Sequence, residues 1–116
     1  MDIIIVGCGK VGSTLADVLS SEHNVKVIDT DEEKIESVVN DYDVMGITGN
    51  CLQTSILAEA NVEKTDIFIA LTNSDEVNIL SCLIAKELKA RHCIARVRNP
   101  EFDQQLVFMR ENLKIS

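Results

Sequence analysis

Short aliphatic runs alternate with segments of helical apolar spacing along the whole chain. The continuous aliphatic run at 3–6 is typical of a strand buried on both faces, and apolar-rich segments at 25–28, 44–48, 67–71 and 93–97 are predicted to be further strands. The helical segments lie at 11–19, 35–39, 56–60, 77–88 and 102–109. Because strands and helices alternate strictly, the sequence predicts an α/β fold with a doubly wound parallel sheet, strand order 3-2-1-4-5, and helices on both faces.

The size and charge of the chain exclude several classes of function. Its 116 residues suit a single domain. The net charge of −8 disfavours nucleic acids and anionic membranes, whose partners need a basic face. The longest apolar run, Ile67 to Leu71, is far short of the about 20 residues that span a membrane, so we expect a cytoplasmic protein without direct membrane insertion. Four cysteines without C-x-x-C spacing indicate free thiols and no metal site.

The first predicted strand is followed by a complete G-x-G-x-x-G motif that opens a helix, formed by Gly7, Cys8, Gly9, Lys10, Val11 and Gly12. Gly7 permits the tight turn, Gly9 lets a pyrophosphate approach the backbone, and Gly12 lets the helix pack closely on the strand. Free N–H groups and the helix dipole would then face the phosphates. Between a strand and a helix, the motif predicts a Rossmann-like nucleotide site; the alternative is a plain glycine turn.

An acidic residue stands where such a site needs one. Asp29 ends the second strand, 20 residues after Gly9, in position to accept hydrogen bonds from a ribose diol. Its carboxylate would repel a 2′-phosphate, and neither Thr30 nor Asp31 supplies a positive charge, so the sequence favours NAD over NADP. Asp31 is either a second ribose ligand or the N-cap of the following helix.

The third and fourth predicted strands deliver polar residues to the same edge, because the carboxyl ends of parallel strands meet there. Asn50 and Cys51 follow strand 3, in position to flank an adenine. Thr72 and Asn73 follow strand 4, across the switch point from the glycine loop, and Ser74 is a candidate N-cap.

A positive charge lies inside the predicted fifth strand. Arg96 would be costly there without a partner, so we expect it to pair with a ligand phosphate or with a carboxylate such as Glu101.

Five segments resemble a known family in order: GCGKVGSTLA, VIDTDEEKI, TGN, ALTNSDEVNIL and ARVRNPEF. They are similar to the nucleotide-binding domain of Trk-type potassium-uptake regulatory subunits, the regulator-of-potassium-conductance or KTN family. The resemblance implies a cytoplasmic homo-oligomeric subunit, peripheral to the membrane, that binds NAD(H) or ATP/ADP and gates a membrane potassium-translocating subunit. Matched by motif, the ligand residues would be Gly7, Cys8, Gly9, Lys10, Val11, Asp29, Thr72, Asn73 and Arg96.

The chain departs from the family pattern in two places. Asn50 stands where members often carry an acidic residue. The family domain usually continues into a sixth strand and a separate C-terminal domain, so residues 1–116 resemble a single nucleotide-binding domain truncated before both.

The residues favour a conformational switch over an enzyme. A dehydrogenase needs a general acid or base beside the nicotinamide, and His23 and His92 precede strands 2 and 5, at the opposite edge. Two alternatives stay open. One is a fragment of a small NAD-dependent dehydrogenase. The other is a thiol redox sensor with Cys8 and Cys51 at the ligand edge, in which a helix start lowers the pKa of Cys8. In the preferred mechanism the nucleotide bridges the edges of strands 1 and 4 and stabilises one of two assembly states.

Overall fold

The computed structural model describes residues 1–101, and these form one five-stranded parallel sheet in the order β3-β2-β1-β4-β5. The strands are β1 (Asp2–Val6), β2 (Asn24–Asp29), β3 (Met45–Thr48), β4 (Ile67–Ala70) and β5 (His92–Ala95). The predicted fold class and strand order are therefore confirmed. The helix expected around Phe102, Leu106 and Met109 lies outside the described residues.

Four α-helices connect the strands where the apolar spacing predicts them: α1 (Lys10–Ser20), α2 (Glu32–Asp41), α3 (Thr54–Glu59) and α4 (Asp75–Glu87). A short 3₁₀ helix, η1 (Val62–Lys64), follows α3 and was not expected from the sequence. It begins after Asn61, which adopts the left-handed conformation with φ 55°. This turn returns the chain to β4. No helix in the described part of the chain has both the length and the apolar character needed to cross a membrane.

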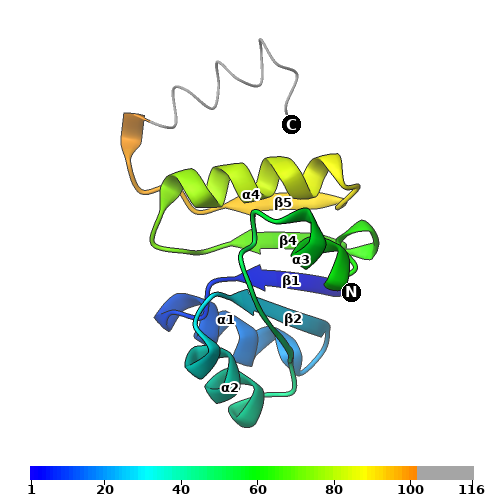
Figure 1. Cartoon of the computed structure of the whole chain (residues 1–116). Coiled ribbons are helices and arrows are strands. Elements are labelled where there is room, and N and C mark those ends of the chain that lie inside the picture. The colour runs from blue at the N-terminus through cyan, green and yellow to red at the C-terminus, as the bar shows by residue number, and fades with distance from the viewer. Residues whose placement is uncertain (102–116) are drawn as a thin grey trace.

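The central strand, β1, contributes side chains to two separate hydrophobic cores, because alternate side chains point to opposite faces of a sheet. Ile4 and Val6 pack on one face with residues of α3, η1 and α4. Ile3 and Ile5 pack on the other face with residues of α1 and α2. All four side chains are at most 2% exposed, so β1 is the buried centre of the molecule. Figure 1 shows α4 running along β4 and β5, with α1 and α2 gathered beside β1 and β2.

The strands end together at one edge of the sheet, and this edge positions every loop discussed below (Figure 1). Backbone hydrogen bonds continue one residue beyond the strands: Gly7 N–H donates to the Ile28 carbonyl at 2.8 Å, and Leu71 N–H donates to the Val6 carbonyl at 2.8 Å. At the far side, Arg96 N–H donates to the Ala70 carbonyl at 3.0 Å. The prediction that Arg96 lies inside the fifth strand is wrong, because β5 ends at Ala95.

Candidate functional site

A pocket of about 590 Å³ opens at the carboxyl edge of the sheet. Residues that follow all five strands line it, which places it at the switch point between β1 and β4. Its volume lies in the range of small-molecule and cofactor sites. Of the sequence-predicted site residues, those that line the pocket are Gly7, Gly9, Lys10, Val11, Asp29, Asn50, Cys51, Thr72, Asn73 and Arg96.

The packing of the protein itself requires two glycines of the motif, one in the loop after β1 and one in the first turn of α1. Gly7 has a φ of +104°, and a Cβ there would lie 3.0 Å from the backbone carbonyl carbon of Leu71. A Cβ on Gly12 would overlap the carbonyl oxygen of Gly7. At these two positions backbone packs against backbone, and neither position has room for a side chain.

Gly9 differs from the other two glycines. Its φ of −70° is open to any residue, and a Cβ there would meet no atom within 4 Å. Neither backbone conformation nor packing within the described chain explains a glycine at this position. A ligand lying against the backbone at Gly9, which lines the pocket, would explain it.

The start of α1 is open to an anion. Gly9 is its N-cap and makes no side-chain cap bond, and the first turn holds no acidic residue. By contrast, α2 and α4 are capped by Asp31 and Ser74 and carry acidic residues in their first turns. The first N–H groups and the positive end of the α1 dipole therefore face the pocket without a competing protein acceptor from a cap side chain.

Asp29 holds two backbone segments beside the pocket. Its Oδ2 accepts a hydrogen bond from Cys8 N–H at 2.8 Å, and its Oδ1 accepts one from Asp31 N–H at 2.8 Å. An ionised carboxylate has about four acceptor positions, so each oxygen keeps capacity for a ligand hydroxyl. Asp31 lies outside the pocket lining and instead accepts from Glu33 N–H at 3.0 Å, so its side chain is the N-cap of α2.

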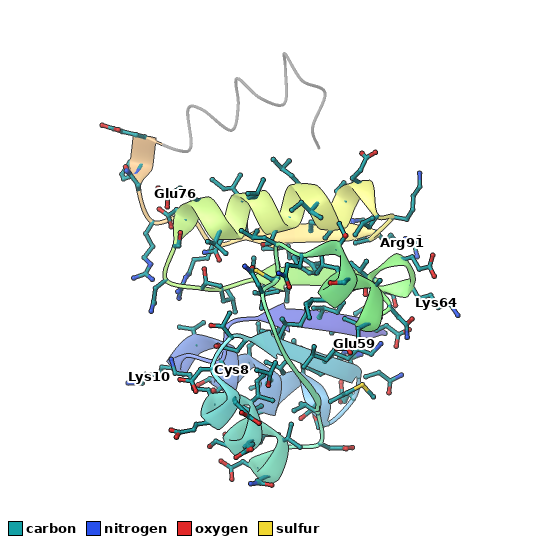
Figure 2. The ribbon with its side chains drawn as sticks, viewed as in Figure 1. Cys8, Lys10, Glu59, Lys64, Glu76 and Arg91 are labelled. Carbon is teal, nitrogen blue, oxygen red and sulfur yellow. The ribbon has the colours of Figure 1, made fainter. Side chains whose placement is uncertain are left out.

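Positive charge is concentrated at this pocket although the chain is acidic. Lys10, Lys34, Arg96 and Arg98 line it, and Asp29 is the single acidic residue among the described lining residues. Figure 2 shows Lys10 at the carboxyl edge of the sheet, away from Lys64 and Arg91. A concave site lined by one sign of charge attracts oppositely charged ligands.

Sequence reasoning missed Lys34 and Arg98 as site residues. Lys34 lies in the first turn of α2, three residues after its cap, so the helix returns it toward the edge where β2 ends. Arg98 is brought in by the loop after β5, where Asp75 accepts hydrogen bonds from the N–H groups of Arg98 at 3.0 Å and Asn99 at 2.9 Å. These two bonds are also the main reason that the pKa of Asp75 is lowered.

Arg96 is bound by backbone carbonyls, not by a carboxylate. Its Nη2 donates to the Leu71 carbonyl at 3.1 Å and to the Thr72 carbonyl at 2.9 Å, so the expected pairing with Glu101 is not observed. Its Nε is buried and has no hydrogen-bond partner in the described residues. A buried donor without a partner is costly, and this one belongs to a side chain that lines the pocket.

Asn78 was also missed, and it joins the ends of β4 and β5 from behind the pocket. It is fully buried on α4. Its Oδ1 accepts hydrogen bonds from the N–H of Thr72 at 2.8 Å and from the Thr72 hydroxyl at 2.7 Å. Its Nδ2 donates to the carbonyls of Thr72 at 3.1 Å and Arg96 at 2.9 Å. The signal in the sequence was an amide among the apolar residues of the longest helix.

At the β3 end, Asn50 uses its side chain locally. Its Oδ1 accepts from Leu52 N–H at 2.9 Å, which shapes the loop that leads to α3. Cys51 is buried but reaches the pocket lining. In this part of the pocket, Cys51 and Leu52 form an apolar wall beside the polar Asn50.

The redox-sensor alternative, in which a helix start lowers the pKa of Cys8, is contradicted by the surroundings of this thiol. Burial, followed by the negative charge of Asp29, raises the pKa of the Cys8 thiol to about 12. Burial also raises the pKa of Cys51. Both thiols therefore stay protonated near neutral pH, which removes the physical basis of the redox-sensor alternative built on them.

Comparison with known sequences identifies the family. The TrkA-N domain family model matches residues 3–111. The chain belongs to the TrkA-N domain family. A Trk system potassium uptake protein TrkA homolog from Archaeoglobus fulgidus is 44% identical over 102 residues, which cover 88% of this chain and 23% of that relative. This TrkA-N domain thus spans about a quarter of the length of that relative.

Solved structures agree with the Rossmann-like fold of this TrkA-N domain. The NAD(P)-binding domain of an exopolyphosphatase-related protein from Archaeoglobus fulgidus matches with a TM-score of 0.75 at 18% identity, covering 97% of this chain and 98% of that one. The Shewanella denitrificans Kef CTD in AMP-bound form matches with a TM-score of 0.72 at 15% identity, covering 98% and 80%. Because both structures are less than 20% identical to this chain, the similarity establishes the fold alone.

Most of the predicted site residues line the pocket of this TrkA-N domain, and three do not. Cys8, Gly12 and Asp31 do not line it. They act on its shape through the backbone: Cys8 through its bond to Asp29, Gly12 through contact with the Gly7 carbonyl, and Asp31 through the cap of α2.

Proposed function

We propose that this TrkA-N domain binds an adenine nucleotide and serves as the regulatory switch of a potassium-uptake system. The observation that carries the proposal is the pocket itself, where an uncapped helix start, four cations and one fixed carboxylate surround a glycine that the protein does not otherwise need. Phosphates suit the helix start and cations, and a ribose diol suits the carboxylate.

The proposed binding mode follows the order of these groups along the edge. Phosphates lie over Gly9 and the first turn of α1, and the ribose diol donates to Asp29. The adenine lies toward Asn50 and Cys51. The part of the ligand beyond the first phosphate extends toward β4 and β5, where Thr72, Asn73, Arg96 and Arg98 line the pocket.

The proposed ligands are NAD(H) and ATP or ADP. The negative charge of Asp29 disfavours the 2′-phosphate of NADP, and Lys34 offsets part of that repulsion because it lines the same pocket. All the proposed ligands share a free adenosine diol, so we expect them to compete.

We propose binding without catalysis, because the histidines lie far from the pocket edge in the fold. His92 is the first residue of β5, and His23 directly precedes β2, with its Nδ1 3.3 Å from the N-terminal ammonium of Met1. Both therefore lie at the amino edge of the sheet, where they cannot serve a nicotinamide at the carboxyl edge.

The partners are proposed from the named relatives. A relative called a Trk system potassium uptake protein suggests a membrane potassium-translocating subunit as partner and a cytoplasmic position beside it. We further propose that copies of the domain associate and that the nucleotide favours one assembly state through a difference in affinity. Binding that is equal in both states would shift nothing.

Calorimetric titration with AMP, ADP, ATP, NAD⁺ and NADH tests the proposal directly. We expect saturable binding of at least one of them, competition among those that bind, and no protein-dependent loss of NADH absorbance with a panel of keto acids. Absence of binding by all five ligands would overturn the nucleotide site. NADH oxidation proportional to protein concentration would instead overturn the regulatory function.

A further inference from the structure

The polar groups behind the pocket form one connected network at Asn78. This side chain is fully buried, and both ends of its amide are used: the oxygen accepts twice from Thr72, and the nitrogen donates to the carbonyls of Thr72 and Arg96. Asn78 thus fixes the backbone where β4 and β5 end, although it does not line the pocket.

The same network orients Arg96. The Thr72 carbonyl accepts from Asn78 Nδ2 at 3.1 Å and from Arg96 Nη2 at 2.9 Å, so one oxygen links the amide to the guanidinium. The Arg96 carbonyl is held at 2.9 Å by the same Nδ2. Asn78 therefore restrains Arg96 at two points, its backbone and the anchor of its side chain. Among the residues that the structure describes, Arg96 Nε has no hydrogen-bond partner.

We propose that Asn78 is a positioning residue that makes affinity depend on how far the ligand extends beyond its first phosphate. The inference rests on the proposed nucleotide site. Asn78 acts through Thr72 and Arg96, at the β4–β5 side of the pocket, whereas the glycine loop and Asp29 lie at the β1–β2 side. A ligand that ends at the first phosphate does not need the groups that Asn78 holds; a longer anionic ligand does.

The network also explains why an amide stands at this position. An amide can accept from an N–H and donate to two carbonyls at once, which neither a carboxylate nor an aliphatic side chain can do. Asn78→Asp keeps the shape and the acceptor but replaces the donor by an oxygen that faces the carbonyls of Thr72 and Arg96. The substitution therefore disturbs these carbonyls while leaving Asp29 and Gly9 untouched.

The test compares AMP with ATP and NADH in native protein and in Asn78→Asp. We expect the affinity for ATP and NADH to fall by about tenfold or more, because Arg96 is no longer oriented to donate a charged hydrogen bond to the ligand. The affinity for AMP should change by about twofold or less. Asn78→Ser, which is smaller and keeps a hydroxyl donor, is the second variant if the aspartate variant does not fold.

Ile84→Ala is the matched control. Ile84 is partly buried on the same helix and packs against the same core, so its truncation weakens the packing of α4 without touching the amide network. We expect a lower melting temperature and an unchanged ratio of AMP to ATP affinity. Equal losses for AMP and ATP in the Asn78 variants, or no loss for either, would overturn the positioning role.

Hydrogen exchange in the native chain gives a readout that needs no variant. The Thr72 amide donates to Asn78 Oδ1, so we expect ATP to slow its exchange and AMP to leave it unchanged. Equal protection by both ligands overturns the inference while the nucleotide site stands. Failure of the native chain to bind any adenine nucleotide overturns the proposed function first, and this inference with it.

Discussion

The Asp29 carboxylate holds the backbone of Cys8, with Oδ2 accepting the Cys8 N–H at 2.8 Å. The residue proposed to bind the ribose thus also braces the glycine loop that is proposed to bind the phosphates. Because Oδ1 accepts from Asp31 N–H at 2.8 Å, the carboxylate is fixed from both sides before a ligand arrives. Fixing a ligand group in advance reduces the ordering cost of binding.

This double role predicts the behaviour of Asp29→Asn. The asparagine NH₂ must face one of the two N–H donors, so one hydrogen bond is replaced by a donor–donor contact. We expect the free protein to lose about 1–3 kcal/mol of unfolding free energy, measured by denaturant titration. We also expect weaker NADH binding and a smaller preference for NADH over NADPH, because the repulsive charge is removed.

Asp31→Asn is the matched control for that prediction. It removes the same charge two residues away, and asparagine caps a helix about as well as aspartate, so stability and ligand preference should change little. Native protein that binds NADPH as tightly as NADH, or an unchanged NADH to NADPH ratio in Asp29→Asn, would show that Asp29 is not the ribose ligand.

Substitutions at Gly9 and Gly12 should separate the effect on ligand affinity from the effect on stability. In Gly9→Ala, the poorer N-cap and the lower entropy of the unfolded chain offset each other to within about 1 kcal/mol, and the new methyl meets no protein atom. We therefore expect a near-native melting curve with nucleotide affinity reduced at least tenfold, by about 1.4 kcal/mol or more. Unchanged affinity in a folded Gly9→Ala protein would place the phosphates elsewhere.

Gly12→Ala should instead lower the stability of the fold. Its methyl would overlap the Gly7 carbonyl oxygen, so α1 must move away from β1. Overpacking of this kind costs about 1–3 kcal/mol, and we expect a clear loss of stability by thermal or denaturant unfolding before any ligand is added. A stability equal to that of Gly9→Ala would contradict the packing described here.

Thiol reactivity checks the protonation of the cysteines. Because burial and Asp29 raise the pKa of Cys8 to about 12, almost none of it is thiolate at pH 8, and iodoacetamide should modify it only after unfolding. Cys93 should react first, because a hydrogen bond from the Cys82 thiol lowers the pKa of Cys93. Mass mapping of the alkylated peptides measures the order, with all four sites reacting in denaturant as the control. Rapid labelling of native Cys8 would restore the redox-sensor alternative.

An exposed leucine on α4 gives a test of self-association. Leu80 is 46% exposed, although the helix carries a broad set of apolar residues, and half of this large side chain therefore stays in water in the single chain. We expect the native domain to self-associate and Leu80→Glu to shift it toward a monomer in light scattering, with little change in melting temperature. Val18→Glu, at a valine of α1 that is 63% exposed, adds the same single negative charge away from α4 and controls for it. A native monomer of 12.8 kDa at all concentrations would contradict pairing through α4.

The sequence alone determined the architecture and half of the pocket. Uninterrupted runs such as Ile3 to Val6 are typical of strands buried on both faces, and the strict alternation of strands and helices predicted the parallel sheet and the strand order that the structure shows. Gly7, Gly9 and Asp29 were found for a related reason. Their roles depend on local turn geometry and on a spacing of one βαβ unit, both of which can be read along the chain.

Only the tertiary structure decided which residues cooperate across the sheet. No spacing in the sequence shows that Lys34 returns from α2 to the pocket, that Asp75 holds the loop of Arg98, or that the Asn78 amide bonds to the backbone after β4 and β5. The same holds for Cys8, whose position at a helix start suggested a lowered pKa, whereas its burial and the neighbouring Asp29 carboxylate raise the pKa. Desolvation and hydrogen bonding depend on neighbours that are remote in sequence, and these neighbours exist only once the strands have packed side by side.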